Sequence, residues 1–105
     1  MNKMLQGTTA KLVITIPDPI TVADIINVEL TFEHVGTKKI VHIDGVTLDT
    51  EENTVMYRFT ERETLDMDPK QPLYWQLRIK TQDGIYGTEK DSIDIKDLLS
   101  EEVMP

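Results

Sequence analysis

Apolar and polar side chains alternate along most of this 105-residue chain, and turn-forming residues interrupt the alternation roughly every eight to twelve residues. A two-residue period places the apolar side chains of a segment on one face of a β-strand. Such a face needs a second layer to bury it, and short strands at this spacing are typical of two packed antiparallel sheets. The pattern therefore predicts an all-β fold.

Seven segments carry the alternation, at residues 11–17, 25–35, 38–44, 46–48, 54–60, 73–81 and 85–95. Their number and spacing predict an antiparallel immunoglobulin-like β-sandwich of about seven strands, without the disulfide of true immunoglobulin domains. The segment 73–81 alternates most regularly, and we expect it to be the central core strand. The predicted core consists of Leu30, Phe32, Tyr57, Phe59, Leu73, Trp75, Leu77 and Ile79. Ile26, Val28, Val41, Ile43 and Val55 are also expected to point inward.

The connection after residue 81 has two candidate registers. A two-residue Asp83-Gly84 turn pairs Thr81 with Tyr86 and turns the later isoleucines away from Trp75, which would expose every apolar side chain of the strand. A three-residue loop that ends in a left-handed Gly84 pairs Thr81 with Ile85 instead. We favour the second register, which places Ile85 and the isoleucines at 93 and 95 on the Trp75 face and requires a further break near residues 89–91.

One helical turn is expected near residues 60–66. Thr60 is followed three residues later by Glu63, which is the capping-box pattern of a helix N-terminus. Pro69 and Pro72 prevent the helix from extending further. We therefore expect a short turn that crosses from one sheet to the other.

We expect one domain with a short additional segment at each end. Residues 11–96 form the predicted sandwich, and residues 97–105 are an acidic segment expected to be a short helix or a loose tail. Residues 1–10 are an N-terminal arm or edge strand. Met4 and Leu5 make the arm a candidate for exchange with a neighbouring copy, while an ordinary edge strand within the same monomer is the equal alternative.

The composition narrows the classes of partner. Nineteen acidic residues against eleven Lys and Arg give a formal net charge of −8. Such a charge repels phosphate backbones and anionic headgroups, so neither nucleic acid nor membranes are expected partners. No apolar run suggests a signal peptide or a membrane helix, and we expect synthesis in a cytoplasm. The absence of cysteine excludes disulfides and thiolate metal sites.

No group of residues indicates catalysis, a cofactor or a metal. Neither serine, Ser92 nor Ser100, lies in a glycine-flanked elbow beside a histidine. His34 and His42 are expected at a strand rim and on the surface, and a shared metal between them is the weaker interpretation. The acids at 66–68 resemble the start of a calcium loop, but the required glycine and glutamate are missing. We therefore predict a protein that is not an enzyme.

A carbohydrate-binding or cell-surface immunoglobulin-like module is the alternative function. Stacking on sugar rings would use exposed aromatic side chains that converge on one face. Trp75 is in phase with the core, which leaves Tyr74 and Tyr86 as candidate interaction residues together with Met4 and Leu5. A lone surface tyrosine needs no functional explanation.

Five segments resemble a known group of proteins. They are Leu5–Ala10, Val28–Phe32, Phe59–Leu65, Trp75–Gly84 and Asp97–Val103. The chain resembles small proteins encoded among the tail genes of phages and prophages of Gram-positive bacteria, which are similar to the N-terminal domain of the phage baseplate upper protein. In that group the third segment usually reads Leu-Thr-Gln-Glu-Glu/Asp-Thr-Leu, whereas this chain has Phe59, Glu61 and Arg62 at the first, third and fourth positions.

The resemblance implies a structural or adaptor protein of the virion tail, associated with the baseplate. It implies docking onto other phage tail proteins, with a homo-oligomer as a further expectation, and no catalytic residues. The expected location is the phage virion after synthesis in the host cytoplasm.

Overall fold

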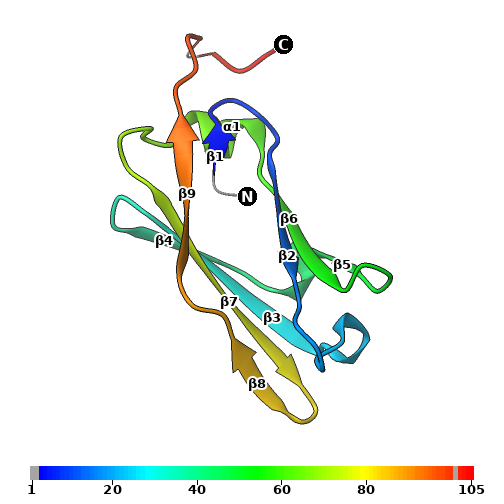
Figure 1. Cartoon of the computed structure of the whole chain (residues 1–105). Coiled ribbons are helices and arrows are strands. Elements are labelled where there is room, and N and C mark those ends of the chain that lie inside the picture. The colour runs from blue at the N-terminus through cyan, green and yellow to red at the C-terminus, as the bar shows by residue number, and fades with distance from the viewer. Residues whose placement is uncertain (1–2, 101) are drawn as a thin grey trace.

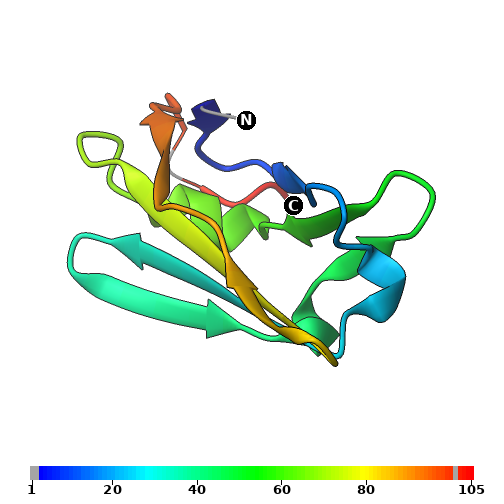
Figure 2. The ribbon, with the colours of Figure 1, turned by 60° about the horizontal axis from the view of Figure 1, so that its bottom comes forward.

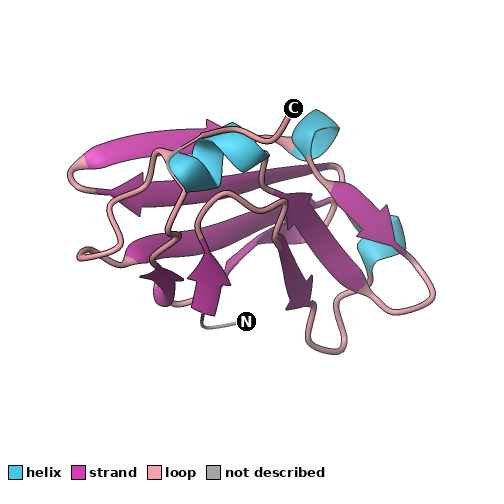
Figure 3. Cartoon of the chain, turned by 90° about the horizontal axis from the view of Figure 1, so that it is seen from above, coloured by secondary structure: helices cyan, strands magenta, loops and turns pink. Residues whose placement is uncertain are grey.

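The computed structural model describes residues 3–100 and 102–105 and is mostly β (Figure 1). Figure 3 shows that the helices are short pieces within the connections between strands. The strands are β1 (Lys3–Leu5), β2 (Lys11–Thr15), β3 (Asn27–His34), β4 (Thr37–Val41), β5 (Thr47–Asp49), β6 (Thr54–Arg58), β7 (Leu73–Thr81), β8 (Gly84–Gly87) and β9 (Asp91–Lys96). The helices are η1 (Val22–Asp24), η2 (Ile43–Gly45) and α1 (Glu61–Leu65).

The strands form two sheets. One has the order β1-β9-β7-β3-β4 with β8 also paired to β7, and the other has the order β2-β6-β5. Figure 1 places β2, β6 and β5 to the right of β9 and β7. Apolar residues from the alternating positions of both sheets form one buried cluster. The all-β prediction is thus confirmed.

One strand pair departs from the expected antiparallel arrangement. β1 runs parallel to β9, with Met4 opposite Ile95. Both side chains are buried, with exposed fractions of 3% and 4%. Parallel neighbours need a long crossover, and here nearly the whole chain lies between them. Three residues of alternation fix which side chain points inward but carry no information on strand direction, so the prediction of purely antiparallel sheets was wrong.

The core contains all eight residues assigned to it from the pattern, with exposed fractions from 0% for Leu30 to 9% for Trp75. Phe32, Tyr57 and Phe59 form an aromatic cluster with ring centroids 5.0–5.2 Å apart. Aromatic pairs at this separation stabilise by roughly 0.5–1.5 kcal/mol beyond area burial. This cluster joins β3 of one sheet to β6 of the other.

The hairpin between β7 and β8 has neither of the two expected registers. Thr81 pairs with Gly84, so the loop is Gln82-Asp83. The Thr81 hydroxyl accepts a hydrogen bond from the Asp83 N–H at 3.2 Å, and Gly84 has a φ of 158° that is open mainly to glycine. Ile85 therefore lies opposite Lys80 and is 62% exposed, which corrects its predicted inward position.

The expected break in the last strand lies between β8 and β9. The Thr88 N–H donates to the Leu77 carbonyl, and the Thr88 hydroxyl accepts from the Leu77 N–H. The register along β7 then shifts by one residue, so Ile93 faces Leu73 and is fully buried. The sequence pattern therefore placed the side chains of Ile93 and Ile95 on the correct face of the sheet, and that of Ile85 on the wrong face.

Ile26 is 50% exposed, although the pattern predicts an inward position. It precedes β3, whose first residue is Asn27. Val22 from η1 is 2% exposed and belongs to the core cluster. A helical residue thus contributes to the core, which the alternation of the strand does not reveal.

The chain ends are tied to α1 by Gln6. Its amide donates to the carbonyls of Leu65 and Met67 and accepts from the Leu98 N–H. At Gly7, with a φ of 68°, an added Cβ would lie 2.6 Å from Leu98 Cδ2. In the C-terminal segment the Glu102 N–H donates to the Ser100 hydroxyl, and the Met104 N–H donates to Glu61 of α1 (Figure 3). No helix forms among its described residues.

Candidate functional site

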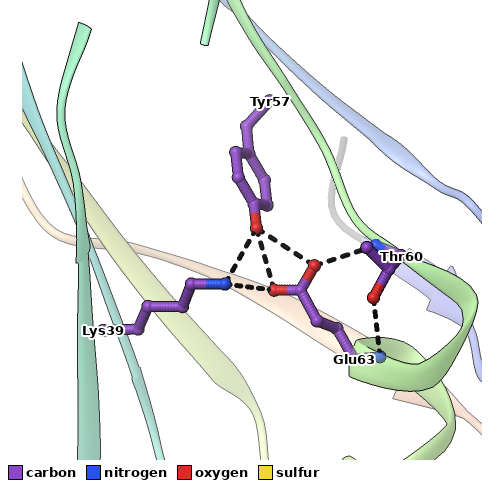
Figure 4. A network of polar contacts seen from close by, with 4 residues as sticks. All are labelled: Lys39, Tyr57, Thr60 and Glu63. Atoms are coloured by element: carbon purple, nitrogen blue, oxygen red, sulfur yellow. Dashed lines mark hydrogen bonds and ion pairs between the residues drawn. The ribbon is translucent and has the colours of Figure 1, made fainter. Parts of the chain in front are cut away.

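A polar network links the β3–β4 hairpin to α1 (Figure 4). Glu63 accepts from Lys39 Nζ at 2.7 Å, from the Tyr57 hydroxyl at 2.8 Å and from the Thr60 N–H at 2.9 Å. The Thr60 hydroxyl in turn accepts from the Glu63 N–H at 3.0 Å, which completes the predicted capping box. One carboxylate therefore both caps the helix and fastens β4 to it.

The network stabilises one charge state. Burial raises the pKa of the Glu63 carboxyl, but hydrogen bonds from Lys39, the Thr60 N–H and Tyr57 outweigh it and hold that pKa below its ordinary value. The hydrogen bond to Glu63 raises the pKa of Lys39 against an opposing effect of burial. Burial also raises the pKa of the Tyr57 phenol. The fold therefore favours an anionic Glu63, a cationic Lys39 and a neutral Tyr57.

A hollow of about 450 Å³ lies beside this network. Apolar side chains from β3, the end of β6 and the start of β7 line it together with charged groups from α1 and the loop that follows. Its lining residues are Phe32, His34, Val35, Thr37, Lys39, Phe59, Glu63, Asp66, Met67, Asp68 and Leu73.

His34 fixes one wall of this hollow. Its Nε2 accepts from the Asp68 N–H at 2.8 Å, so Nδ1 carries the proton and donates to the Pro72 carbonyl at 3.2 Å. His42 hydrogen-bonds the Val28 carbonyl. Both histidines thus act as structural hydrogen-bonding groups, and the described residues contain no cluster of His, Cys, Asp or Glu able to hold a metal ion. The described helices also include none long and apolar enough to cross a membrane.

The strand β4 forms one edge of the larger sheet (Figure 2). Its residues Thr37 and Lys39 line the hollow. Only Val41 of its five residues is buried. Ile40 is 53% exposed on the outer face, and the side chain of Lys38 is 68% exposed. Within the described part of the chain, β4 pairs with β3 alone.

The tip of the β3–β4 hairpin is strained. Val35 and Gly36 both have positive φ angles, of 51° and 77°. Two-residue hairpin turns of this kind favour Asn-Gly, and a β-branched residue at positive φ is rare. Val35 is nonetheless 63% exposed and gains little from packing. A strained, exposed apolar side chain on the rim of a hollow suggests a contact with another molecule.

The four residues proposed for interaction occupy different places. Met4 is buried in β1 opposite Ile95 of β9 and offers no surface, whereas Leu5 is 44% exposed on the β1 edge. Tyr74 lies opposite Glu33 on the outer face, with Lys90 Nζ 4.6 Å from its ring centroid. Tyr86 pairs with Ile79 and so lies on the other face, 40% exposed. The two tyrosines cannot form a common stacking platform.

Sequence reasoning missed Lys39 and Val35 as site residues. A lysine on an edge strand looks like any solvated charge, and its ion pair with Glu63 joins residues 24 positions apart. The only available signal was the dipeptide Val35-Gly36, because glycine at the second position of a two-residue turn implies positive φ at the first.

Comparison with known proteins adds no relative. No protein-family model matches the sequence, and no curated protein matches it.

Proposed function

We propose that this chain is an immunoglobulin-like β-sandwich of a phage or prophage tail that acts without catalysis, by docking onto other tail proteins near the baseplate. The sandwich assignment is supported by the order of strands, with β2-β6-β5 in one layer and β9-β7-β3-β4 in the other. Immunoglobulin variable-type domains distribute strands B, E and D, and G, F, C and C′, in the same way. On this assignment β1 is an added edge strand, and β8 with β9 forms a divided strand G.

The observation that carries the docking function is the open edge strand β4 beside the hollow. An edge strand offers backbone N–H and C=O groups that can pair with another extended chain. Ile40 on β4 and Val35 at the tip of its hairpin add exposed apolar surface, with exposed fractions of 53% and 63%. The network through Glu63 holds this edge against α1, so a partner would meet a rigid surface.

The tail assignment rests on the resemblance of five segments to tail-region proteins. Two of them, Val28–Phe32 and Trp75–Gly84, lie largely on the central strands β3 and β7, and a third contains the capping box of α1. These are positions that maintain the scaffold. The docking edge itself lies outside the five segments, as expected if partners differ among related proteins.

A test is to probe tail particles purified from an induced culture of the source bacterium with an antibody against this chain. The proposal predicts that the chain co-sediments with tails, and that Lys38→Glu reduces its incorporation more than Lys80→Glu. Lys80 is an exposed control on β7 of the same sheet, so the two variants change the net charge equally. A chain that stays with the cytoplasmic fraction while tails assemble would overturn the proposal.

A further inference from the structure

The pairing pattern of β4 determines which of its backbone groups are free. Thr37 follows a two-residue turn, and the residues that flank such a turn form a hydrogen-bonded pair. Hydrogen-bonded pairs alternate along an antiparallel ladder, so Lys39 and Val41 also direct their backbone groups toward β3. The N–H and C=O groups of Lys38 and Ile40 therefore point outward from the sheet, where an extended segment of another molecule can pair with them.

The strand β4 is basic on an otherwise acidic molecule. The chain has a formal net charge of −8, whereas β4 contains two lysines and no acid. Lys39 forms an ion pair with Glu63 at 2.7 Å. Lys38 has a weaker partner, because its contact with Glu33 is 3.8 Å long and its side chain is 68% exposed. Lys38 is therefore the charge of β4 that a partner can meet.

The lysines disfavour pairing of β4 with β4 of a second copy. Two-fold ladders that reach beyond one end residue of β4 are centred on residue 38, 39 or 40. In the first two registers a lysine lies directly opposite its own counterpart, and like charges so placed destabilise the pair. The third register joins residues 39–41 alone. Edge lysines are a common protection against such association, whereas a segment with an acidic side chain gains from them.

The outer face of β4 specifies two side chains of an antiparallel segment. Lys38 and Ile40 lie on this face, opposite Glu33 and Thr31 of β3, and Ile40 is 53% exposed. Residues of the segment opposite Lys38 and Ile40 share the same face, because side chains that face each other across a ladder point the same way. An acidic side chain therefore fits opposite Lys38, and an apolar side chain fits opposite Ile40.

The inner face of β4 specifies a third side chain. Thr37 and Lys39 line the hollow of about 450 Å³ together with the apolar side chains of Phe32, Val35 and Met67. Successive residues of a strand point to opposite faces, so the residue opposite Lys39 lies on the side of the hollow. An apolar side chain at this position would remove apolar surface of the hollow from water.

We infer that β4 binds, as an added antiparallel strand, an extended segment of another protein that places an acidic residue opposite Lys38 and apolar residues opposite Lys39 and Ile40. This inference rests on the proposed docking function and names the chemistry of the partner. Backbone hydrogen bonds at Lys38 and Ile40 hold the segment, and the charge of Lys38 selects an acidic segment over a basic one.

Two synthetic peptides test this inference in nuclear magnetic resonance titrations of the ¹⁵N-labelled full chain, at about 10 mM ionic strength. One is the capped peptide Ser-Thr-Val-Val-Glu-Thr-Ser, and the other has lysine in place of its glutamate. The acidic peptide is expected to shift the amide resonances of Lys38 and Ile40 and to bind about fivefold more tightly than the basic one.

Two pairs of variants separate the charge from the backbone pairing. Lys38→Glu should reverse the preference between the peptides, whereas Lys80→Glu, at an exposed lysine of β7, should leave it unchanged. Ile40→Pro removes an outward N–H without removing a bond to β3, and it should abolish binding of both peptides. Ile40→Val keeps the N–H and should bind as the wild type does. Circular dichroism of each variant establishes that it is folded.

Three results would overturn the inference. The first is that neither peptide moves the resonances of Lys38 and Ile40. The second is that the members of either pair of variants behave alike. The third is that the same resonances move with protein concentration in the absence of peptide, which would place a second copy on β4. Each is distinguishable from a failure of the proposed function, because the chain can still be recovered with purified tails.

Discussion

The two edges of the larger sheet are built in opposite ways. At β1 the edge is short, parallel to its neighbour and anchored by the buried Met4, and Gln6 ties it to α1 and to the C-terminal segment. At β4 the edge is longer, almost wholly exposed and guarded by two lysines. The β1 edge is stabilised by packing and hydrogen bonds, whereas the β4 edge carries exposed lysine charges. On the proposed function, β4 is therefore the edge that a partner would use.

The largest expected effect is a difference in the free energy of unfolding between substitutions at the two edges. Met4→Ala removes a side chain that is 3% exposed and should lower the free energy of unfolding by about 2–3 kcal/mol. Ile40→Ala, at 53% exposure on the opposite edge, should change it by less than about 0.5 kcal/mol. Urea unfolding of both variants measures the contrast. Equal losses would mean that β4 is packed as closely as β1.

The hydrogen-bonding anchor of the β1 edge gives the next effect. Gln6→Ala removes three hydrogen bonds to backbone groups of α1, its following loop and Leu98. We expect a loss of about 1–2 kcal/mol in urea unfolding, because partly buried backbone groups lose their partners. Gln76→Ala is the matched control, since that amide makes one exposed hydrogen bond to Thr88. A loss no greater than the control's would contradict the anchoring role.

At the β4 edge a substitution should stabilise the protein. Val35→Asn places the preferred residue at the first position of the Val35-Gly36 turn, where φ is 51°. Relief of the positive φ strain should raise the free energy of unfolding by about 1 kcal/mol. Thermal unfolding tests this, with Val13→Asn as control because Val13 is similarly exposed, at 51%, within β2. A destabilised Val35→Asn would mean that Val35 makes contacts that outweigh its strain.

The smallest effect concerns pH and the attachment of β4 to α1. The folded state lowers the pKa of Glu63, so its stabilising contribution is complete above the unfolded value of 4.5 and is lost as pH falls through the folded value. Lys39 has a raised pKa, so its contribution is complete below 10.5 and is lost as pH rises through the folded value.

Glu63→Gln should lower the free energy of unfolding by about 0.5 kcal/mol near neutral pH. It should also make the free energy of unfolding fall less steeply as the pH is lowered. Urea unfolding between about pH 3 and pH 7 measures this effect. Glu33→Gln is the control, because the Glu33 contact with Lys38 is more exposed and longer, at 3.8 Å. If Glu63→Gln loses stability at low pH as steeply as the wild-type protein, the network does not control the acid dependence of stability.

The alternation of apolar and polar residues predicts well which side chains of a strand are buried, but it predicts poorly how the edge strands pair. It assigned the core residues on β3, β6 and β7, because a two-residue period determines burial wherever a strand lies inside a sheet. It also located the capping box, because Thr60 and Glu63 are close in sequence. These features depend on local spacing alone.

The errors lie where long-range pairing or a single loop residue decides the geometry. Ile85 is exposed because Thr81 and Gly84 close the hairpin one residue earlier than expected. The parallel direction of β1 is set by contact with a strand near the other end of the chain. Lys39 joins the site only through an ion pair to Glu63, which no local pattern contains.

The openness of β4 is tested most directly by residue-resolved amide hydrogen exchange on a dilute sample. The N–H groups of Lys38 and Ile40 should exchange rapidly, while those of Lys39 and Val41 should be protected by their pairing with β3. Equal, strong protection of all four amides in the dilute sample would contradict an open edge at β4.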